Sequence, residues 1–161
     1  MLQKIISGGQ SGVDRAALDV ALELGLPCGG WCPKGRKAED GPLPARYPLK
    51  ETPSDDYAQR TRWNVRDSDG TLVLMRRTPT EGTAFTIDTA ARLTRPCLII
   101  DLTQSPAATE VQTWIRLQTI RILNVAGPRE SGQAGIYLEA ARFLRLALSS
   151  LATTATGASG T

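Results

Sequence analysis

The residues best placed to do chemistry lie in a glycine-rich turn near the N-terminus, Ser7-Gly8-Gly9-Gln10-Ser11-Gly12-Val13-Asp14-Arg15. The apolar run Leu2–Ile6 precedes this turn, and a helical pattern follows it. The first amides of a helix lack partners within the helix and carry partial positive charge, so they attract anions. Glycines also let a ligand approach the backbone closely. The turn therefore predicts a site for a phosphate-bearing small molecule, with Asp14 adding an acceptor and Arg15 a cation.

The same turn could instead start a helix without binding a ligand. Ser11 and Asp14 stand three residues apart, as in a capping box, and Gly8-Gly9 could form an ordinary tight turn. The dinucleotide pattern G-x-G-x-x-G and the Walker pattern G-x-x-x-x-G-K-[ST] are both absent, which argues against an ordinary NAD or ATP site. Three glycines exceed what a cap needs, and this favours the ligand interpretation.

Composition predicts one cytoplasmic domain. The chain has 161 residues, of which 41% are hydrophobic and 22% charged. A net charge of +3 without a dense Lys/Arg run makes nucleic acid an unexpected partner. The odd number of cysteines (Cys28, Cys32 and Cys97) is typical of a reducing compartment. Neither a membrane-spanning apolar stretch nor a signal peptide is apparent, so no membrane association is expected.

The chain contains no histidine, which restricts the chemistry available to it. Ser-His-Asp and Cys-His hydrolases and His-ligated zinc sites are excluded. General acid–base catalysis would have to use Asp, Glu, Lys, Tyr or Cys. Cys28 and Cys32 fit C-x-x-C spacing poorly and are expected to be small buried residues, so no metal site is predicted.

Alternating strand and helix patterns indicate an α/β fold. Strands are expected at Leu2–Ile6, Leu26–Trp31, Gly70–Met75, Cys97–Leu102 and Arg121–Ala126. Helices are expected at Val13–Leu24, from the Ser54-Asp55-Asp56 cap to about Val65, from Thr83 to Leu93, at Ala107–Thr119, and from about 133 to Leu148. The stretch 32–53 is expected to be irregular. Residues 1–150 would form the domain and 151–161 a flexible tail.

This alternation predicts a mostly parallel sheet of about five strands, with right-handed crossovers and helices on both faces. Ligands of such sheets bind outside the carboxyl ends of the strands. Each polar glycine motif of the chain follows a predicted strand. We therefore expect these motifs to meet at one edge of the sheet.

Three further segments should join the opening turn there. The loop after the second strand carries Lys34 and Arg36, although a basic loop is often only a solvated surface. Gly82 and Thr83 stand at another helix start, where Thr83 could simply be a cap. The last segment is Gly127-Pro128-Arg129-Glu130-Ser131. Its Arg129 suits bidentate recognition of phosphate, whereas Ser131 could cap the final helix and Glu130 could pair with Arg129.

A polar cluster at the end of the second predicted helix is harder to interpret. Helical spacing brings Asn64, Asp67 and Ser68 near one another. They could hydrogen-bond a ligand, or they could tether the strand that follows.

With these motifs together, the chain resembles the putative molybdenum carrier family, a circularly permuted YpsA-like branch of the Lonely Guy-related (SLOG) Rossmann-like superfamily. The resemblance covers residues 2 to about 148. It rests on the blocks Gly8-Gly9-Gln10-Ser11-Gly12-Val13-Asp14-Arg15-Ala16-Ala17-Leu18-Asp19, Gly30-Trp31-Cys32-Pro33-Lys34-Gly35-Arg36, Ala38-Glu39-Asp40-Gly41, Tyr47-Pro48-Leu49, Trp63-Asn64-Val65-Arg66-Asp67-Ser68-Asp69-Gly70-Thr71 and Asn124-Val125-Ala126-Gly127-Pro128-Arg129-Glu130-Ser131.

The resemblance implies a single Rossmann-like domain, a homo-oligomer (dimer or tetramer) and a pocket for an anionic cofactor. That cofactor would be molybdenum cofactor (molybdopterin), a phosphorylated pterin that holds its metal by a dithiolene, or otherwise a nucleotide or phosphate ligand. The expected function is that of a molybdenum cofactor carrier. The residues expected to bind the ligand are Gly8, Gly9, Gln10, Ser11, Gly12, Asp14, Arg15, Lys34, Arg36, Asn64, Asp67, Gly82, Thr83, Gly127, Arg129 and Ser131.

Two other functions stay open. The superfamily includes Lonely Guy-type nucleoside-monophosphate phosphoribohydrolases, which use Arg and Glu within a P-G-G-x-G-T motif. That motif is not intact here, and no catalytic residue is assigned. In a hydrolase the acid–base group would have to be Asp14, Glu39, Asp40, Glu81 or Glu130. The third possibility is a sensor of a nucleotide-derived signal.

Overall fold

The computed structural model describes residues 1–156, with side chains described as far as residue 152. Its centre is a five-stranded sheet in the order β2-β1-β7-β5-β6, and every neighbouring pair is parallel. The strands are β1 (Lys4–Ile6), β2 (Cys28–Gly29), β5 (Gly70–Met75), β6 (Cys97–Asp101) and β7 (Ile122–Ala126). The predicted Rossmann-like α/β fold is confirmed.

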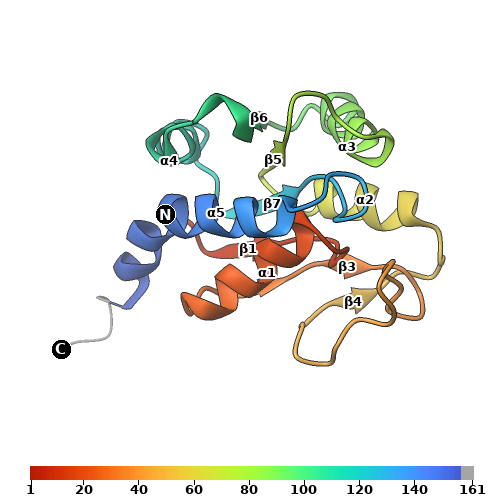
Figure 1. The fold of residues 1–161 in the computed structure, drawn as a ribbon. Helices are drawn as coiled ribbons and strands as arrows, with labels where there is room; N and C mark the ends of the chain where they lie inside the picture. Colours follow the sequence, from red (N-terminus) through yellow and green to blue (C-terminus); the bar gives the residue numbers. More distant parts are fainter. Residues whose placement is uncertain (157–161) are drawn as a thin grey trace.

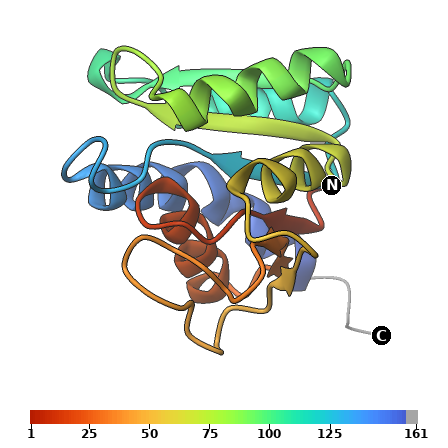
Figure 2. The same cartoon turned by 90° about the vertical axis from the view of Figure 1, so that its right-hand side faces the viewer.

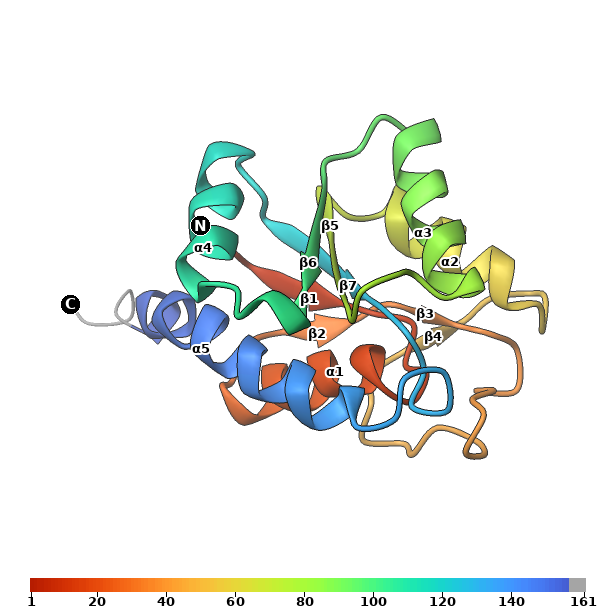
Figure 3. The same cartoon turned by 45° about the horizontal axis from the view of Figure 1, so that its top comes forward.

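Five helices cover both faces of this sheet, as Figures 1 and 3 show. One face carries α1 (Val13–Glu23), α4 (Ala108–Leu117) and α5 (Ile136–Thr156). The other carries α2 (Tyr57–Arg66) and α3 (Glu81–Arg92), and the short 3₁₀ turn η1 (Leu102–Gln104) follows β6. Within residues 1–156, none of the helices is long and apolar enough to span a membrane.

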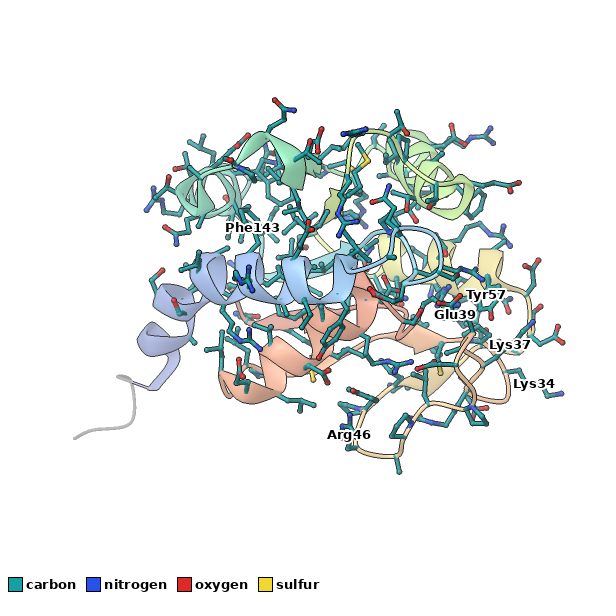
Figure 4. All side chains as sticks on the ribbon, viewed as in Figure 1. Lys34, Lys37, Glu39, Arg46, Tyr57 and Phe143 are labelled. Atoms are coloured by element: carbon teal, nitrogen blue, oxygen red, sulfur yellow. The ribbon has the colours of Figure 1, made fainter. Side chains whose placement is uncertain are left out.

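The core lies between the central strands and the α1, α4 and α5 layer. All six residues of β5 are buried, because helices lie on both of its faces. Leu72 and Leu74 of β5 pack in one cluster with Leu144 of α5. Phe143, on the same helix, belongs to this cluster too (Figure 4). Burial of each such side chain contributes about 1.5–3 kcal/mol, so these contacts stabilise the packing of α5 against the sheet.

The second predicted strand is wrong in its extent. Its first part forms β2, but the chain turns at Gly30, and Trp31–Cys32 becomes β3 in a separate two-stranded sheet with β4 (Lys50–Glu51). Gly30 has φ 123°, and an added Cβ there would lie 2.4 Å from the Ser7 carbonyl oxygen. Only glycine fits this bend. The expected irregular stretch 32–53 therefore contains a strand.

The last helix also differs from the prediction, because α5 continues to Thr156 rather than ending near Leu148. The rest of the expected tail, 157–161, lies outside the described residues.

Strand order determines where the loops meet. The chain places β2 outside β1 and later inserts β7 between β1 and β5. The segments after β1, β5 and β7 therefore leave the same edge at the point where strand order reverses, which is where ligands of open α/β sheets bind. Figure 2 shows the glycine turn (red), the 127–135 loop (blue) and the 33–49 loop (orange) side by side at this edge.

Candidate functional site

A cavity of about 720 Å³ opens at this edge of the sheet. Its volume is in the range of small-molecule sites. The glycine turn, α2, the start of α3 and the segment after β7 contribute to its wall. The lining residues are Gly8, Gln10, Asp14, Tyr57, Ala58, Arg60, Thr61, Asn64, Thr80, Glu81, Gly82, Thr83, Phe85, Thr86, Asn124, Ala126, Gly127, Arg129 and Gly132.

The glycine turn is held by close backbone packing. Gly12 is the N-cap of α1 with φ 82°, and no side chain caps the helix, so the possible capping box does not form. A Cβ on Gly12 would lie 2.3 Å from the Pro128 carbonyl oxygen. Gly9 packs against the side chains of Leu43 and Leu49 and does not line the cavity. Gly9 and Gly12 therefore shape the turn by letting other chain segments approach it.

Asp14 and Arg60 form the charged floor of the cavity. Both side chains are buried, and Arg60 Nη1 lies 3.9 Å from Asp14 Oδ2 while it donates to the Gly8 carbonyl oxygen at 2.8 Å. Burial raises the pKa of Asp14 to about 6, although Arg60 and the Gln10 amide favour the charged form. Burial also lowers the pKa of Arg60, against the pull of Asp14. A carboxyl with its pKa near neutrality in a cavity is a candidate for acid–base chemistry.

Gln10 lies beside this pair and is fixed by its side-chain oxygen. Oε1 accepts the backbone N–H of Ser11 at 3.0 Å and that of Glu39 at 2.8 Å. Its Nε2 is buried and has no hydrogen-bond partner among the residues that the structure describes.

The start of α3 forms the opposite side of the cavity. Glu81, Gly82 and Thr83 are its first residues, and no side chain caps the helix. Thr83 is buried, and its hydroxyl lies 3.0 Å from that of Thr80. An added Cβ on Gly82 would meet no atom within 4 Å, so the backbone there is open to a ligand. This arrangement suits an anion, because the amides of the first turn lack helical partners.

Aromatic rings and Arg129 complete the wall. Tyr57 and Phe85 both line the cavity. The guanidinium of Arg129 lies 5.2 Å from the centre of the Tyr57 ring, and that of Arg60 lies 5.0 Å from it. Arg129 also approaches Glu39, whose Oε2 is 3.9 Å from Arg129 Nη1. Arg129 is partly exposed, so it could turn toward a ligand.

Three of the expected cations, Lys34 and Arg36 of the 33–49 loop and Arg15 of α1, do not line the cavity. Arg36 has φ 54° and donates to the carbonyl oxygens of its own loop, including those of Pro44 at 2.7 Å and Tyr47 at 2.9 Å. Lys34 is exposed and points away from the sheet in Figure 4. Arg15 forms a bidentate pair with Asp40 at 3.0 and 2.9 Å. Arg36 holds the loop through its carbonyl oxygens, and Arg15 holds it through Asp40.

Glu39 holds the 33–49 loop against the glycine turn and the 127–135 loop. Its carboxylate accepts the hydroxyls of Ser11 and Ser131 and the Ser131 amide. Burial opposes ionisation, but these bonds outweigh it and lower the pKa of Glu39. Glu130 accepts the amides of Gly135 at 2.9 Å and Tyr137 at 3.3 Å, so it caps α5 in place of Ser131. Ser11 and Ser131 therefore hold loops together and do not line the cavity.

The cluster at the end of α2 mostly tethers β3. Asn64 accepts the Trp31 amide at 2.8 Å and donates to the Trp31 carbonyl oxygen at 2.9 Å, while still lining the cavity. Asp67 accepts the Trp31 indole N–H at 2.8 Å and is outside the cavity.

Of the sixteen residues expected at the site, eight line the cavity: Gly8, Gln10, Asp14, Asn64, Gly82, Thr83, Gly127 and Arg129. Sequence reasoning missed Tyr57, Arg60, Phe85 and Asn124, among others. Asn124 carried a usable signal, since it is an amide within an apolar strand just before a glycine motif. The sequence gives no comparable signal for Arg60, because an arginine in a polar helix is normally exposed to solvent.

Comparison with known proteins gives two matches. Residues 5–148 match the family described as circularly permutated YpsA SLOG. The crystal structure of a protein described as a putative molybdenum carrier from Syntrophus aciditrophicus SB is similar, with a TM-score of 0.89 and 45% sequence identity over 91% of this chain and 95% of that one. Among curated proteins no match was found. The fold and the extent of the match agree with the expected resemblance, and the chain belongs to the circularly permuted YpsA SLOG family.

Proposed function

We propose that the protein binds a phosphorylated heterocyclic ligand in this cavity and acts as its carrier. The observation that carries the proposal is the pairing of two arginines and an uncapped helix start with aromatic rings in one cavity. Arg129 and the first amides of α3 suit a phosphate, and Tyr57 and Phe85 suit the faces of a ring. Asn64 and Asn124 add amide groups to the same wall.

Molybdopterin fits this donor set. Its phosphate would meet the start of α3 and Arg129, and its pterin would lie near Tyr57 and Phe85. The cofactor supplies molybdenum redox chemistry through its own dithiolene sulfurs, so the cavity needs only to hold and shield it. Within residues 1–156 no group of three or more Cys, Asp or Glu side chains is arranged to hold a metal ion. The solved structure described as a putative molybdenum carrier protein supports the same assignment.

Native mass spectrometry of the protein from a molybdenum-replete host tests this proposal. We expect a bound phosphorylated pterin in the wild type. Arg129→Ala should weaken binding of added neopterin monophosphate about ten-fold or more, because a charge-assisted hydrogen bond contributes about 1.5–3 kcal/mol. Arg142→Ala, at an exposed position on α5, is the matched control and should bind normally. A wild type that carries no pterin and binds no phosphorylated probe would overturn the proposal.

A second function is favoured by one observation, the raised pKa of Asp14 beside Arg60. Such a carboxyl could protonate a leaving base in a nucleoside-monophosphate hydrolase. Of the five acids considered from sequence, only Asp14 and Glu81 line the cavity, whereas Glu39, Asp40 and Glu130 are held by other groups.

Incubation with AMP or GMP and measurement of the released base separates the two functions. A carrier should release no base above the uncatalysed rate. Release that is abolished by Asp14→Asn or Glu81→Gln, but not by Asp55→Asn at an exposed position, would favour the hydrolase.

A further inference from the structure

The cavity reaches from the edge of the sheet down between α2 and α3, which lie side by side on one face (Figure 3). Tyr57 and Asn64 both line it, and the seven residues of helix between them span about 10 Å at about 1.5 Å each. Gly127 and Asn124 line it too, and three residues of strand also span about 10 Å, at about 3.3 Å each. Two walls thus give the same depth, which lets a fused two-ring heterocycle enter lengthwise.

Charged and uncharged side chains lie at different depths of this cavity. Asp14, Glu81 and Arg129 come from the segments that follow β1, β5 and β7, at the edge of the sheet. Arg60 belongs to the same edge, because it donates to the Gly8 carbonyl oxygen of the glycine turn. The lining side chains further along each element are polar but uncharged, and they form the inner end of the cavity: Thr61, Asn64, Thr86 and Asn124. The inner end can therefore hydrogen-bond a ligand without attracting its charge.

The side-chain amide of Asn124 is only half paired. Leu123 and Val125, its neighbours on β7, pack in the core cluster on the other face of the sheet, so Asn124 points toward α2 and α3. Its Nδ2 donates to Thr71 Oγ1 at 3.2 Å, and this is the one hydrogen bond of the side chain among the described residues. A carboxamide has a donor end and an acceptor end, so the other end stays free.

The free end of this amide is open to the cavity. Among the described side chains that are not exposed, Gln10 Nε2 is the only nitrogen or oxygen that is both covered and unpaired. The unpaired end of Asn124 is therefore accessible. Asn124 is 2% exposed and lines this cavity, so a partner for its free end would come from the cavity. Buried amides are almost always paired with protein, ligand or ordered water, and this one is left for a ligand or water.

We propose that the ligand enters ring first and that Asn124 is a specificity-determining residue, whose free carboxamide end hydrogen-bonds the polar edge of a fused-ring heterocycle. The inference rests on the proposed function and specifies its ligand class. The edge of a purine or pteridine carries ring nitrogens, amino groups or carbonyls that pair with an amide. The phosphate of the same ligand stays at the edge of the sheet, with Arg129 and the first amides of α3.

Binding of two probes to the wild type and to Asn124→Leu tests the inference. Neopterin monophosphate has both ring and phosphate, whereas ribose 5-phosphate lacks the heterocycle and is measured by competition against it. Leu keeps the shape of Asn but cannot hydrogen-bond. We therefore expect neopterin monophosphate to bind about ten-fold more weakly, and ribose 5-phosphate to bind as before. Gln118→Met makes the same kind of change at an exposed position that follows α4, and it should leave both affinities unchanged.

A second measurement on the wild type does not depend on how well the variant folds. The Asn124 side-chain NH₂ signals in a ¹⁵N spectrum should shift on addition of neopterin monophosphate, but not of inorganic phosphate. Signals that bound neopterin monophosphate leaves unmoved would refute the inference. So would an Asn124→Leu variant that binds this probe as tightly as the wild type, or that loses affinity for both probes equally. These outcomes leave the proposed function standing, whereas failure of both probes to bind the wild type would refute the proposed function itself.

Discussion

Replacing Asp14 with Asn should make the protein less sensitive to pH. Asp14 is buried at the start of α1, and burial raises its pKa from 3.8 to about 6. The folded protein therefore holds this proton more tightly than the unfolded chain does. Charging the carboxyl at neutral pH favours unfolding, and Asn cannot be charged.

The size of the effect follows from the shift. A rise from 3.8 to about 6 is about 2 pH units, and at about 1.36 kcal/mol each this corresponds to about 3 kcal/mol. Charging Asp14 costs the folded protein no stability below pH 3.8. The loss of unfolding free energy grows as the pH rises toward 6 and is constant above that. Between pH 4 and pH 8 the wild type should therefore lose about 2–3 kcal/mol of unfolding free energy relative to Asp14→Asn.

Urea unfolding of both proteins at several pH values measures this difference directly. The other titrating groups are common to both proteins, so their contributions cancel. The result is therefore read from how the difference in unfolding free energy between the two proteins changes with pH. Asp55→Asn removes a carboxyl at an exposed position and controls for the loss of one charge. The reasoning would be refuted if the difference in unfolding free energy stayed constant within about 0.5 kcal/mol from pH 4 to pH 8. It would also be refuted if the wild type became more stable relative to the variant as the pH rises.

Two further changes test how the site is held. Gly12→Ala should lower the melting temperature much more than Gly25→Ala, since both glycines have positive φ but only at Gly12 would a Cβ meet backbone, the Pro128 oxygen at 2.3 Å. Similar losses in the two variants would contradict the close-packing account. Tyr137→Phe should cost about 1.5–3 kcal/mol at neutral pH by removing its bond to Asp19. Because burial and this carboxylate raise the pKa of Tyr137 to about 12, the wild type should also lose more stability than the variant between pH 10 and pH 12, as alkaline unfolding can check.

The sequence was sufficient to predict the main sheet because its signals are local. Gly70–Met75 contains four consecutive large apolar residues, Leu72–Met75, as expected of a strand covered on both faces. The β3–β4 pair could not be predicted in the same way. It joins Trp31–Cys32 to Lys50–Glu51 across a long loop, and two-residue strands leave no periodicity to detect.

The candidate site was predictable where the backbone determines it. The glycine turn and the α3 start were placed at the correct edge because both follow strands of a parallel sheet. Side-chain partners were not predictable, because they depend on residues distant in sequence. Arg15 pairs with Asp40, and Arg36 is taken up by carbonyl oxygens of its own loop.

The charged side chains that line the cavity show how strongly it would attract an anion. Arg60 and Arg129 line it, but so do Asp14 and Glu81, so the charged side chains nearly balance. The number of Lys and Arg residues in the loops therefore overestimates how strongly the cavity attracts an anion. The backbone amides at the start of α3, together with an Arg129 that a phosphate could draw away from Glu39, account for it better. Phosphate binding in this fold should then depend more on the open backbone at Gly82 than on the basic 33–49 loop.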